Sequence, residues 1–179
     1  MNHVMLDLET LGTKPGCVIL SIGACVFDPR TGPIDLEHFY TTLNIDEQIQ
    51  NGHAVDSSTE KWWKNQNQAA WEQATKDPKP VKESLINFTK WWASNRGTYI
   101  WSQGSNFDGP LIEALFHSFG LLEPWKFYNT RDTRTVYQMC KIDTKSLRRE
   151  GTYHNALDDA LHQARLIAMA VQKIKLVIS

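Results

Sequence analysis

The stretch His3-Val-Met-Leu-Asp-Leu-Glu-Thr10 is a short apolar run that carries two acidic residues near its end. Its β-forming residues predict a buried strand from His3 to Leu8. Asp7 and Glu9 are two residues apart, so the period of a strand directs both carboxylates to the same side. Such a pair is costly to bury unless a cation joins it, and Mg²⁺ and Mn²⁺ prefer oxygen ligands. A strand-end pair that simply faces water is the alternative.

The segments that follow predict the rest of the fold. Turns rich in Gly and Pro separate the first three strands and indicate an antiparallel meander, after which helices and strands alternate. We therefore expect a mixed α/β sheet of five strands flanked by helices. The predicted strands are His3–Leu8, Val18–Asp28, Ile34–Leu43, Thr98–Trp101 and Phe127–Asn129. The predicted helical segments are Asp46–Asn95, Leu111–Phe119 and Asn155–Lys173.

Length and composition predict a single domain. The 179 residues are 41% hydrophobic and contain no repeat or Gly/Ser-rich linker, so we expect one domain over 1–179, with a core over 1–175 and a short C-terminal tail. No apolar run approaches the roughly 20 residues that span a bilayer, and no signal peptide precedes the first strand. We expect a soluble cytoplasmic protein that does not contact membranes. The odd set of three cysteines, without C-x-x-C spacing, indicates reduced thiols and no zinc site.

The net charge of -1 argues against tight, passive binding of nucleic acid, which usually needs a basic excess. An enzyme that binds a short end and releases it needs fewer phosphate contacts. Bound cations would add positive charge that the sequence count omits.

A second acidic motif, Asn106-Phe-Asp108, follows the fourth predicted strand and starts a helix. Sites in α/β sheets often lie at such strand ends. Capping is the alternative, and Asn106 suits an N-cap position.

A third motif, His154-Asn-Ala-Leu-Asp-Asp159, starts the last predicted helix. If Asn155 is the N-cap, Asp158 occupies the third helical position, where an acid can reach back to the cap. Asp159 lies about 100° further round the helix, so it can face a different neighbour. His154 precedes both acids and could be an ordinary polar residue or part of a site.

These residues together resemble the DEDDh exonucleases, a family with a ribonuclease H-like fold that includes ribonuclease T and the proofreading subunit of bacterial DNA polymerase III. The matching motifs are D-x-E-T at Asp7–Thr10, N-F-D at Asn106–Asp108 and H-x-x-x-x-D at His154–Asp159, in the order of the family. The resemblance covers nearly the whole chain. It extends to the small phage and bacterial ribonuclease T-like branch, such as phage exonuclease A and exodeoxyribonuclease VIII-like proteins, through Ser57-Ser-Thr-Glu-Lys-Trp-Trp63.

The resemblance implies a role for each residue of the constellation. Asp7 would bridge two cations, Mg²⁺ or Mn²⁺, with Glu9 and Asp159 helping to hold one of them. Asp108 would steady the site, partly through water, and His154 would be the general base that activates water. The expected reaction is 3'-to-5' hydrolysis of single-stranded DNA or RNA ends, which releases nucleoside 5'-monophosphates.

Substrate contacts are assigned less directly. The resemblance suggests Thr10, Leu11 and Asn106, although Leu11-Gly-Thr13 departs from the Thr-Gly-Leu order that is usual in proofreading enzymes. Phe107 and the pair Trp62-Trp63 are candidates to stack on a base, with core packing as the alternative, and we favour the site for Trp63. The remaining tryptophans that we expect in the core are Trp62, Trp71, Trp91, Trp92 and Trp125.

A basic cluster precedes the last motif and could contact the substrate backbone or form a solvated face. Its members are Lys141, Lys145, Arg148 and Arg149. We leave the role of Arg131-Asp-Thr-Arg134 open.

The aromatic content is compatible with a homodimer. Two other functions are considered, a nucleotide or nucleic-acid binding module that has lost catalysis and an endonuclease of the same fold, and no motif position is missing to favour the first.

Overall fold

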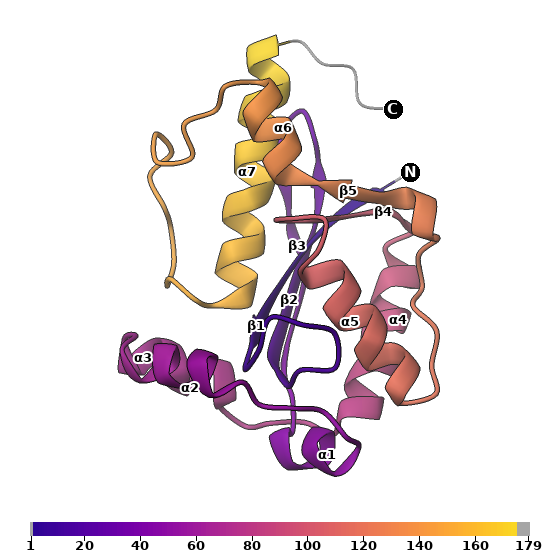
Figure 1. Ribbon diagram of the computed structural model, residues 1–179. Coiled ribbons are helices and arrows are strands. Elements are labelled where there is room, and N and C mark those ends of the chain that lie inside the picture. The colour runs from indigo at the N-terminus through magenta and orange to yellow at the C-terminus, as the bar shows by residue number, and fades with distance from the viewer. Residues whose placement is uncertain (1, 175–179) are drawn as a thin grey trace.

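The computed structural model describes residues 2–174 of the chain, and a mixed five-stranded sheet lies at its centre (Figure 1). The strands are β1 (Asn2–Thr10), β2 (Ile19–Asp28), β3 (Gly32–Thr42), β4 (Gly97–Ser102) and β5 (Thr130–Asp132). They lie in the order β3-β2-β1-β4-β5. The first three form an antiparallel meander, and β4 and β5 run parallel to β1 and β4, which confirms the predicted mixed sheet. The tail that we expect after residue 175 lies outside the described residues.

The prediction of a fifth strand at Phe127–Asn129 is wrong. These residues form a 3-10 turn, and β5 begins just after it with Thr130. Phe127 is 81% exposed, so its aromatic ring is not the mark of a buried strand. The short β5 pairs only with β4 and carries polar residues, and an edge strand of this kind needs no apolar pattern that a sequence could reveal.

Seven α-helices surround the sheet within the described residues. They are α1 (Ile45–Gln50), α2 (Ser57–Lys64), α3 (Gln68–Thr75), α4 (Val81–Ser94), α5 (Asp108–Ser118), α6 (Thr133–Met139) and α7 (Ala156–Ile174). The predicted helical region 46–95 is divided because Asn44, Asp56 and Asn67 each accept a backbone N–H and begin a new helix. We did not predict α6, whose first turn is capped by the carboxylate of Asp132.

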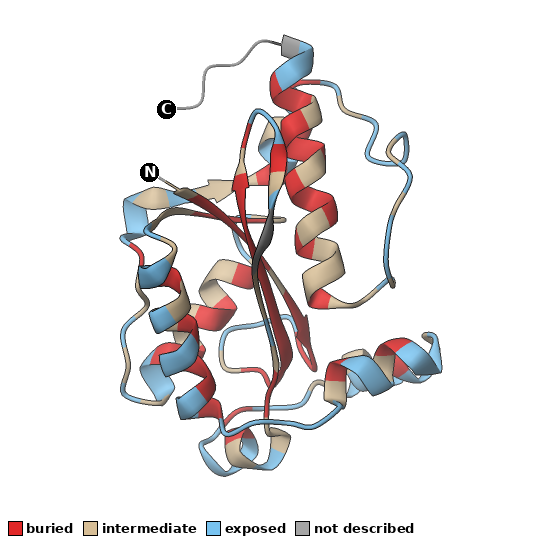
Figure 2. Cartoon of the chain, turned by 180° about the vertical axis from the view of Figure 1, so that it is seen from behind, coloured by how far each residue is buried: buried red, intermediate tan, exposed pale blue. Residues whose placement is uncertain are grey.

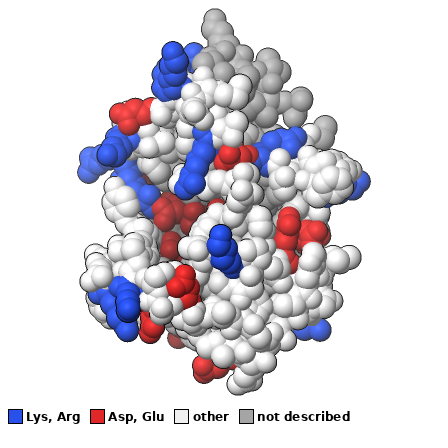
Figure 3. All heavy atoms as spheres, in the orientation of Figure 1, with Lys and Arg blue, Asp and Glu red and all other residues white. Residues whose placement is uncertain are grey.

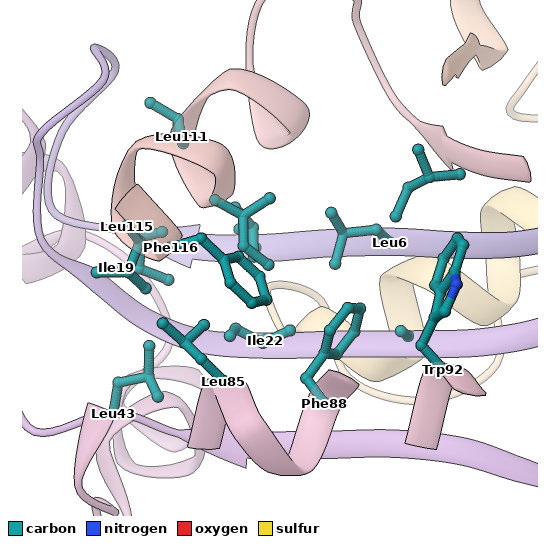
Figure 4. Packing of buried hydrophobic residues seen from close by; sticks show 14 of the residues in the cluster. Leu6, Ile19, Ile22, Leu43, Leu85, Phe88, Trp92, Leu111, Leu115 and Phe116 are labelled. Carbon is teal, nitrogen blue, oxygen red and sulfur yellow. The ribbon is translucent and has the colours of Figure 1, made fainter. Parts of the chain in front are cut away.

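The helices cover both faces of the sheet. One apolar cluster lies between the sheet and α4 and α5, where Phe88 and Trp92 of α4 lie against strand residues such as Leu6 and Ile22 (Figure 4). A second cluster, which includes Met5, joins the opposite face to α6 and α7. Figure 2 shows that buried residues of α7 alternate with partly exposed ones along the helix. β1 is the middle strand of the sheet, and because helices cover both faces its alternate side chains reach different layers.

Two further observations concern the chain as a whole. Within residues 2–174, no helix combines the length and apolar character needed to cross a membrane. The cysteines Cys17, Cys25 and Cys140 are buried and form no disulfide, as predicted.

Gly23 of β2 lets α7 approach the sheet closely. Gly23 lies opposite Asp7 in the β1–β2 ladder. A Cβ atom at this position would lie 2.1 Å from the carbonyl carbon of Ala156 and 2.2 Å from the backbone nitrogen of Leu157. The first turn of α7 therefore rests directly on β2, beside the acidic end of β1.

We predict that Gly23→Ala destabilises the protein by about 2 to 3 kcal/mol, because backbone atoms rather than a flexible side chain must move. The melting temperature, followed by circular dichroism, should fall by roughly 5 to 10 °C. Gly109→Ala is the matched control, since nothing lies within 4 Å of its added Cβ atom. Equal stability of the two variants would contradict the close packing of α7 on β2.

Candidate active site

The three acidic motifs meet around a cavity of about 630 Å³ at the end of β1. Its walls come from β1, from α2, and from the start of α7 with the segment before it. Figure 3 shows Asp and Glu side chains gathered in a hollow of the surface. Of the predicted site residues, those that line the cavity are Asp7, Glu9, Thr10, Trp63, Phe107, His154 and Asp159.

Asp7 and Glu9 both line this cavity, as the period of a strand requires. Asp7 accepts a hydrogen bond of 2.7 Å from the side-chain amide of Gln163. Sequence reasoning missed Gln163, although it lies four residues after Asp159 and so on the same face of α7. Gln163 thus holds the Asp7 carboxylate in place from α7.

His154 lies close to the carboxylates of Glu9 and Asp159. One ligand atom from each of Glu9, His154 and Asp159 lies within 4.8 Å of the other two. His154 adopts a positive φ of 61° just before α7, and the Oδ1 atom of Asn155 accepts the N–H groups of Leu157 and Asp158. The prediction of Asn155 as the N-cap is confirmed, and His154 therefore lies directly before the N-terminus of α7.

Asp158 lies apart from this cluster. We predict that it reaches back to the N-cap, but its carboxylate instead accepts the backbone N–H of Thr152 at 2.7 Å. The chain can pass so close because Gly151 has a positive φ of 82°, and a Cβ atom there would lie 2.3 Å from Cγ of Asp158. Asp158 therefore fixes the segment before the helix and does not line the cavity.

Asp108 approaches the same acids from α5. It is 2% exposed, and its Oδ1 atom accepts the backbone N–H of Leu8 at 3.2 Å. The alternative in which Asn106 is the N-cap does not hold, because Phe107 occupies that position and offers no capping side chain. Asn106 is exposed and does not line the cavity. Asp108 is tied to β1 rather than turned to water.

Burial and mutual repulsion make these acids hard to ionise. Burial, followed by the charges of Asp108 and Glu9, raises the pKa of Asp7 well above its ordinary value of 3.8. Burial also raises the pKa of Glu9 to about 8 and that of Asp108 to about 7. Several carboxylates held together with few donors form a set of hard oxygen ligands that a divalent cation fits.

Arg149 supplies a positive charge to the cavity from the chain itself. Its guanidinium pairs with the carboxylate of Asp159 and lies over the ring of Tyr153, 4.2 Å from the ring centroid. The side chain is only 14% exposed. Its charge lowers the pKa of Glu9 and of Asp7, partly offsetting the effect of burial. The basic cluster predicted before the last motif therefore reaches the acids through Arg149.

Aromatic rings of α2 form another wall of the cavity. Trp63 is buried and donates its Nε1–H to the carbonyl of Thr10 at 2.9 Å. The prediction that Trp62 belongs to the core is wrong, since it is 41% exposed and packs edge-on against His154, 4.8 Å between ring centroids. Both rings line the cavity, although neighbouring helical residues point about 100° apart, and the sequence does not show which of the two is buried. Leu11 is buried beneath Trp63 and does not line the cavity.

Without divalent cations, the protein should lose stability as the pH rises from about 5 to 8. The folded-state pKa values of Glu9 and Asp108 are raised, so the folded state binds more protons than the unfolded state between pH 4.5 and about 8. We expect a loss on the order of 2 kcal/mol in EDTA, measured by urea denaturation. Mn²⁺ at pH 8 should restore the stability.

Glu9→Gln provides the control for this prediction. The amide cannot ionise, so the variant should be more stable than the wild type in EDTA at pH 8 and should depend less on pH. A wild-type pH dependence in Glu9→Gln would show that Glu9 does not contribute to it.

Comparison with known proteins agrees with the geometry. A family model described as "3'-5' exoribonuclease Rv2179c-like domain" matches residues 2–171. The chain is 25% identical over 163 residues to an exodeoxyribonuclease of Enterobacteria phage T4, covering 75% of this chain and 70% of the relative. The nuclease domain of 3'hExo, a DEDDh family member bound to rAMP, has a TM-score of 0.63 at 11% identity, covering 96% of this chain and 92% of that one.

A second solved structure, E. coli exonuclease I in complex with an oligonucleotide, has a TM-score of 0.59 at 15% identity. It covers 97% of this chain but only 40% of that longer one. The ribonuclease H-like fold expected from the motifs is confirmed.

Proposed function

Because the chain belongs to the family of Rv2179c-like 3'-5' exoribonuclease domains, we propose that it hydrolyses the last phosphodiester bond of single-stranded 3' ends and releases nucleoside 5'-monophosphates. The protein is a 3'-5' exonuclease by family, and the finer assignment of substrate and mechanism is ours. One observation carries it, the convergence of Glu9, His154 and Asp159 within 4.8 Å beside Asp7, which lines the same cavity.

The cofactor that we propose is a pair of Mg²⁺ or Mn²⁺ ions. Asp7 would bridge them, Glu9 and Asp159 would help to hold one, and Asp108 would support the site, partly through water. Two cations held there would supply stabilisation of the attacking and the leaving oxygen of an in-line displacement at phosphorus. The raised pKa values of Asp7 and Glu9 fit this role, because acids that repel one another bind a cation in exchange for protons.

We assign His154 as the general base that takes a proton from the attacking water. Burial and the charge of Arg149 lower its pKa below 6.5, so the imidazole is neutral and able to accept a proton at pH 7. The Trp62 ring packs against it nearly at right angles, with 4.8 Å between the ring centroids.

The terminal nucleotide would lie between the acids and the aromatic wall. Phe107 and Trp62 line the cavity and are suited to contact the base, while Trp63 supports the Thr10 backbone from beneath. Contacts from Leu11 and Asn106, which lie outside the cavity lining, stay predictions from the resemblance.

The sugar of the substrate is the point on which the relatives differ. The family is described as exoribonucleases, whereas the phage T4 relative is named an exodeoxyribonuclease. We therefore propose a single-stranded 3' end, of DNA or RNA, as the substrate. A homodimer and a cytoplasmic location, both expected from the sequence, stay predictions.

Matched DNA and RNA strands labelled at the 3' end test the proposal. With Mn²⁺ the protein should release labelled 5'-mononucleotides, should stop when EDTA is added, and should leave a circular single strand intact. Cutting of the circle would favour an endonuclease. Failure to degrade any linear strand, together with metal binding, would favour a binding module. No observation described above supports that function.

A further inference from the structure

A second cavity adjoins the active site. It has a volume of about 610 Å³ and shares three lining residues with the first cavity, Gln103, Arg149 and Tyr153. Beyond this common wall it extends under the segment that joins α6 to α7. We call this second cavity the basic groove, and it adjoins the first cavity across this common wall.

The basic groove is opposite in charge to the first cavity. Lys145, Arg148 and Arg149 line it, and none of its lining residues is acidic. Lys145 and Arg148 are exposed, and neither forms a salt bridge with another residue of the described chain. Figure 3 shows Lys and Arg side chains along the margin of the acidic hollow, on the side where Figure 1 places this segment. Three basic side chains thus lie together beside the active site, although the net charge of the chain is -1.

His162 points to a ligand independently of this surface charge. It lines the basic groove from α7, three residues after Asp159, and is only 9% exposed. Its Nδ1 atom is buried and has no hydrogen-bond partner within residues 2–174. A buried polar nitrogen without a partner is costly, and a rotation of the ring toward the groove would let it donate a hydrogen bond to a phosphate oxygen.

Tyr153 lines both cavities and is suited to contact a base of a strand that extends from one to the other. Its ring is 65% exposed, and the Arg149 guanidinium lies over it. An exposed aromatic ring beside basic side chains is a platform on which the bases of a single strand stack regardless of sequence.

We propose that the basic groove binds the phosphates of the nucleotides that precede the terminal one, so that the strand runs from the active site past Tyr153 toward Lys145 and Arg148. This assignment rests on the proposed function, because it requires a 3' end in the first cavity. It makes affinity depend on strand length, since a dinucleotide would not reach the groove.

The test compares a dinucleotide with a single strand of about eight nucleotides, a length in the range of known single-strand sites. Binding is measured by fluorescence anisotropy with Ca²⁺ in place of Mg²⁺, and strand integrity is checked on a gel. Lys145→Ala combined with Arg148→Ala should weaken binding of the longer strand about tenfold and leave the dinucleotide within about twofold. The slope of log K against log salt should become less negative by about 0.7 for each phosphate that the variant no longer neutralises.

Lys82→Ala combined with Lys90→Ala is the matched control, because both lysines lie on α4, away from the groove. It should bind both strands as the wild type does. Equal weakening of both strands by the groove variant, or no weakening of either, would overturn the proposal. These outcomes are separable from failure of the proposed function, which is read from wild-type cleavage alone.

Discussion

Asp7→Asn lowers the rate of 3'-end hydrolysis by about a thousandfold or more, which is the largest effect that we expect of any single substitution. Asp7 lies at the centre of the acidic cluster, close enough to Asp108 and Glu9 for their charges to raise its pKa. The amide retains the shape and can still accept the hydrogen bond from Gln163. It removes the charge that would hold two cations, whose stabilisation of the reacting oxygens is worth several kcal/mol.

Two measurements distinguish loss of the cation site from loss of the fold. Calorimetric titration with Mn²⁺ should show weaker binding, whereas the melting temperature in EDTA should equal or exceed that of the wild type, since a buried repulsive charge is gone. Asp158→Asn is the matched control, because Asp158 bonds to Thr152 outside the cavity. An Asp7→Asn variant with more than a tenth of wild-type activity would refute the central role of Asp7.

His154→Ala should lower turnover about a hundredfold to ten-thousandfold while leaving Mn²⁺ binding nearly unchanged. The physical reason is that His154 supplies a proton acceptor, whereas the carboxylates carry the charge. The pH profile gives a second readout. Because burial and Arg149 lower the pKa of His154, wild-type activity should fall only when the pH drops through a value below 6.5. His154→Ala should lack this limb.

His117→Ala serves as the control, since His117 is exposed on α5 and pairs with Glu123. It should keep the wild-type rate and the wild-type pH profile. Full activity of His154→Ala would remove the assignment of a general base, and an unchanged acid limb at low activity would assign the limb to another group.

The sequence by itself determined the features that depend on neighbours along the chain. The period of a strand placed Asp7 and Glu9 on one face, and the N-cap Asn155 set where α7 begins. Turn residues separated the first three strands, and apolar periodicity marked α4, α5 and α7. The order of the motifs then indicated the family, and with it the fold.

For some residues the sequence indicated the local structure but not which side chains are buried. Adjacent tryptophans on α2 necessarily point in different directions, yet only packing shows that Trp63 is buried and that Trp62 contacts His154. The aromatic residues before β5 resembled a buried strand, but they are exposed because the chain turns there at the edge of the sheet.

The tertiary structure alone decided which distant side chains meet. Gln163 contacts Asp7 across 156 residues of sequence because Gly23 lets α7 rest on β2. Likewise, only the folded structure shows that Arg149 pairs with Asp159 and that Nδ1 of His162 is buried without a hydrogen-bond partner among residues 2–174. Local conformational preferences act over a few residues. Contacts between distant residues depend on how helices pack on the sheet, and no pattern along the chain indicates that packing.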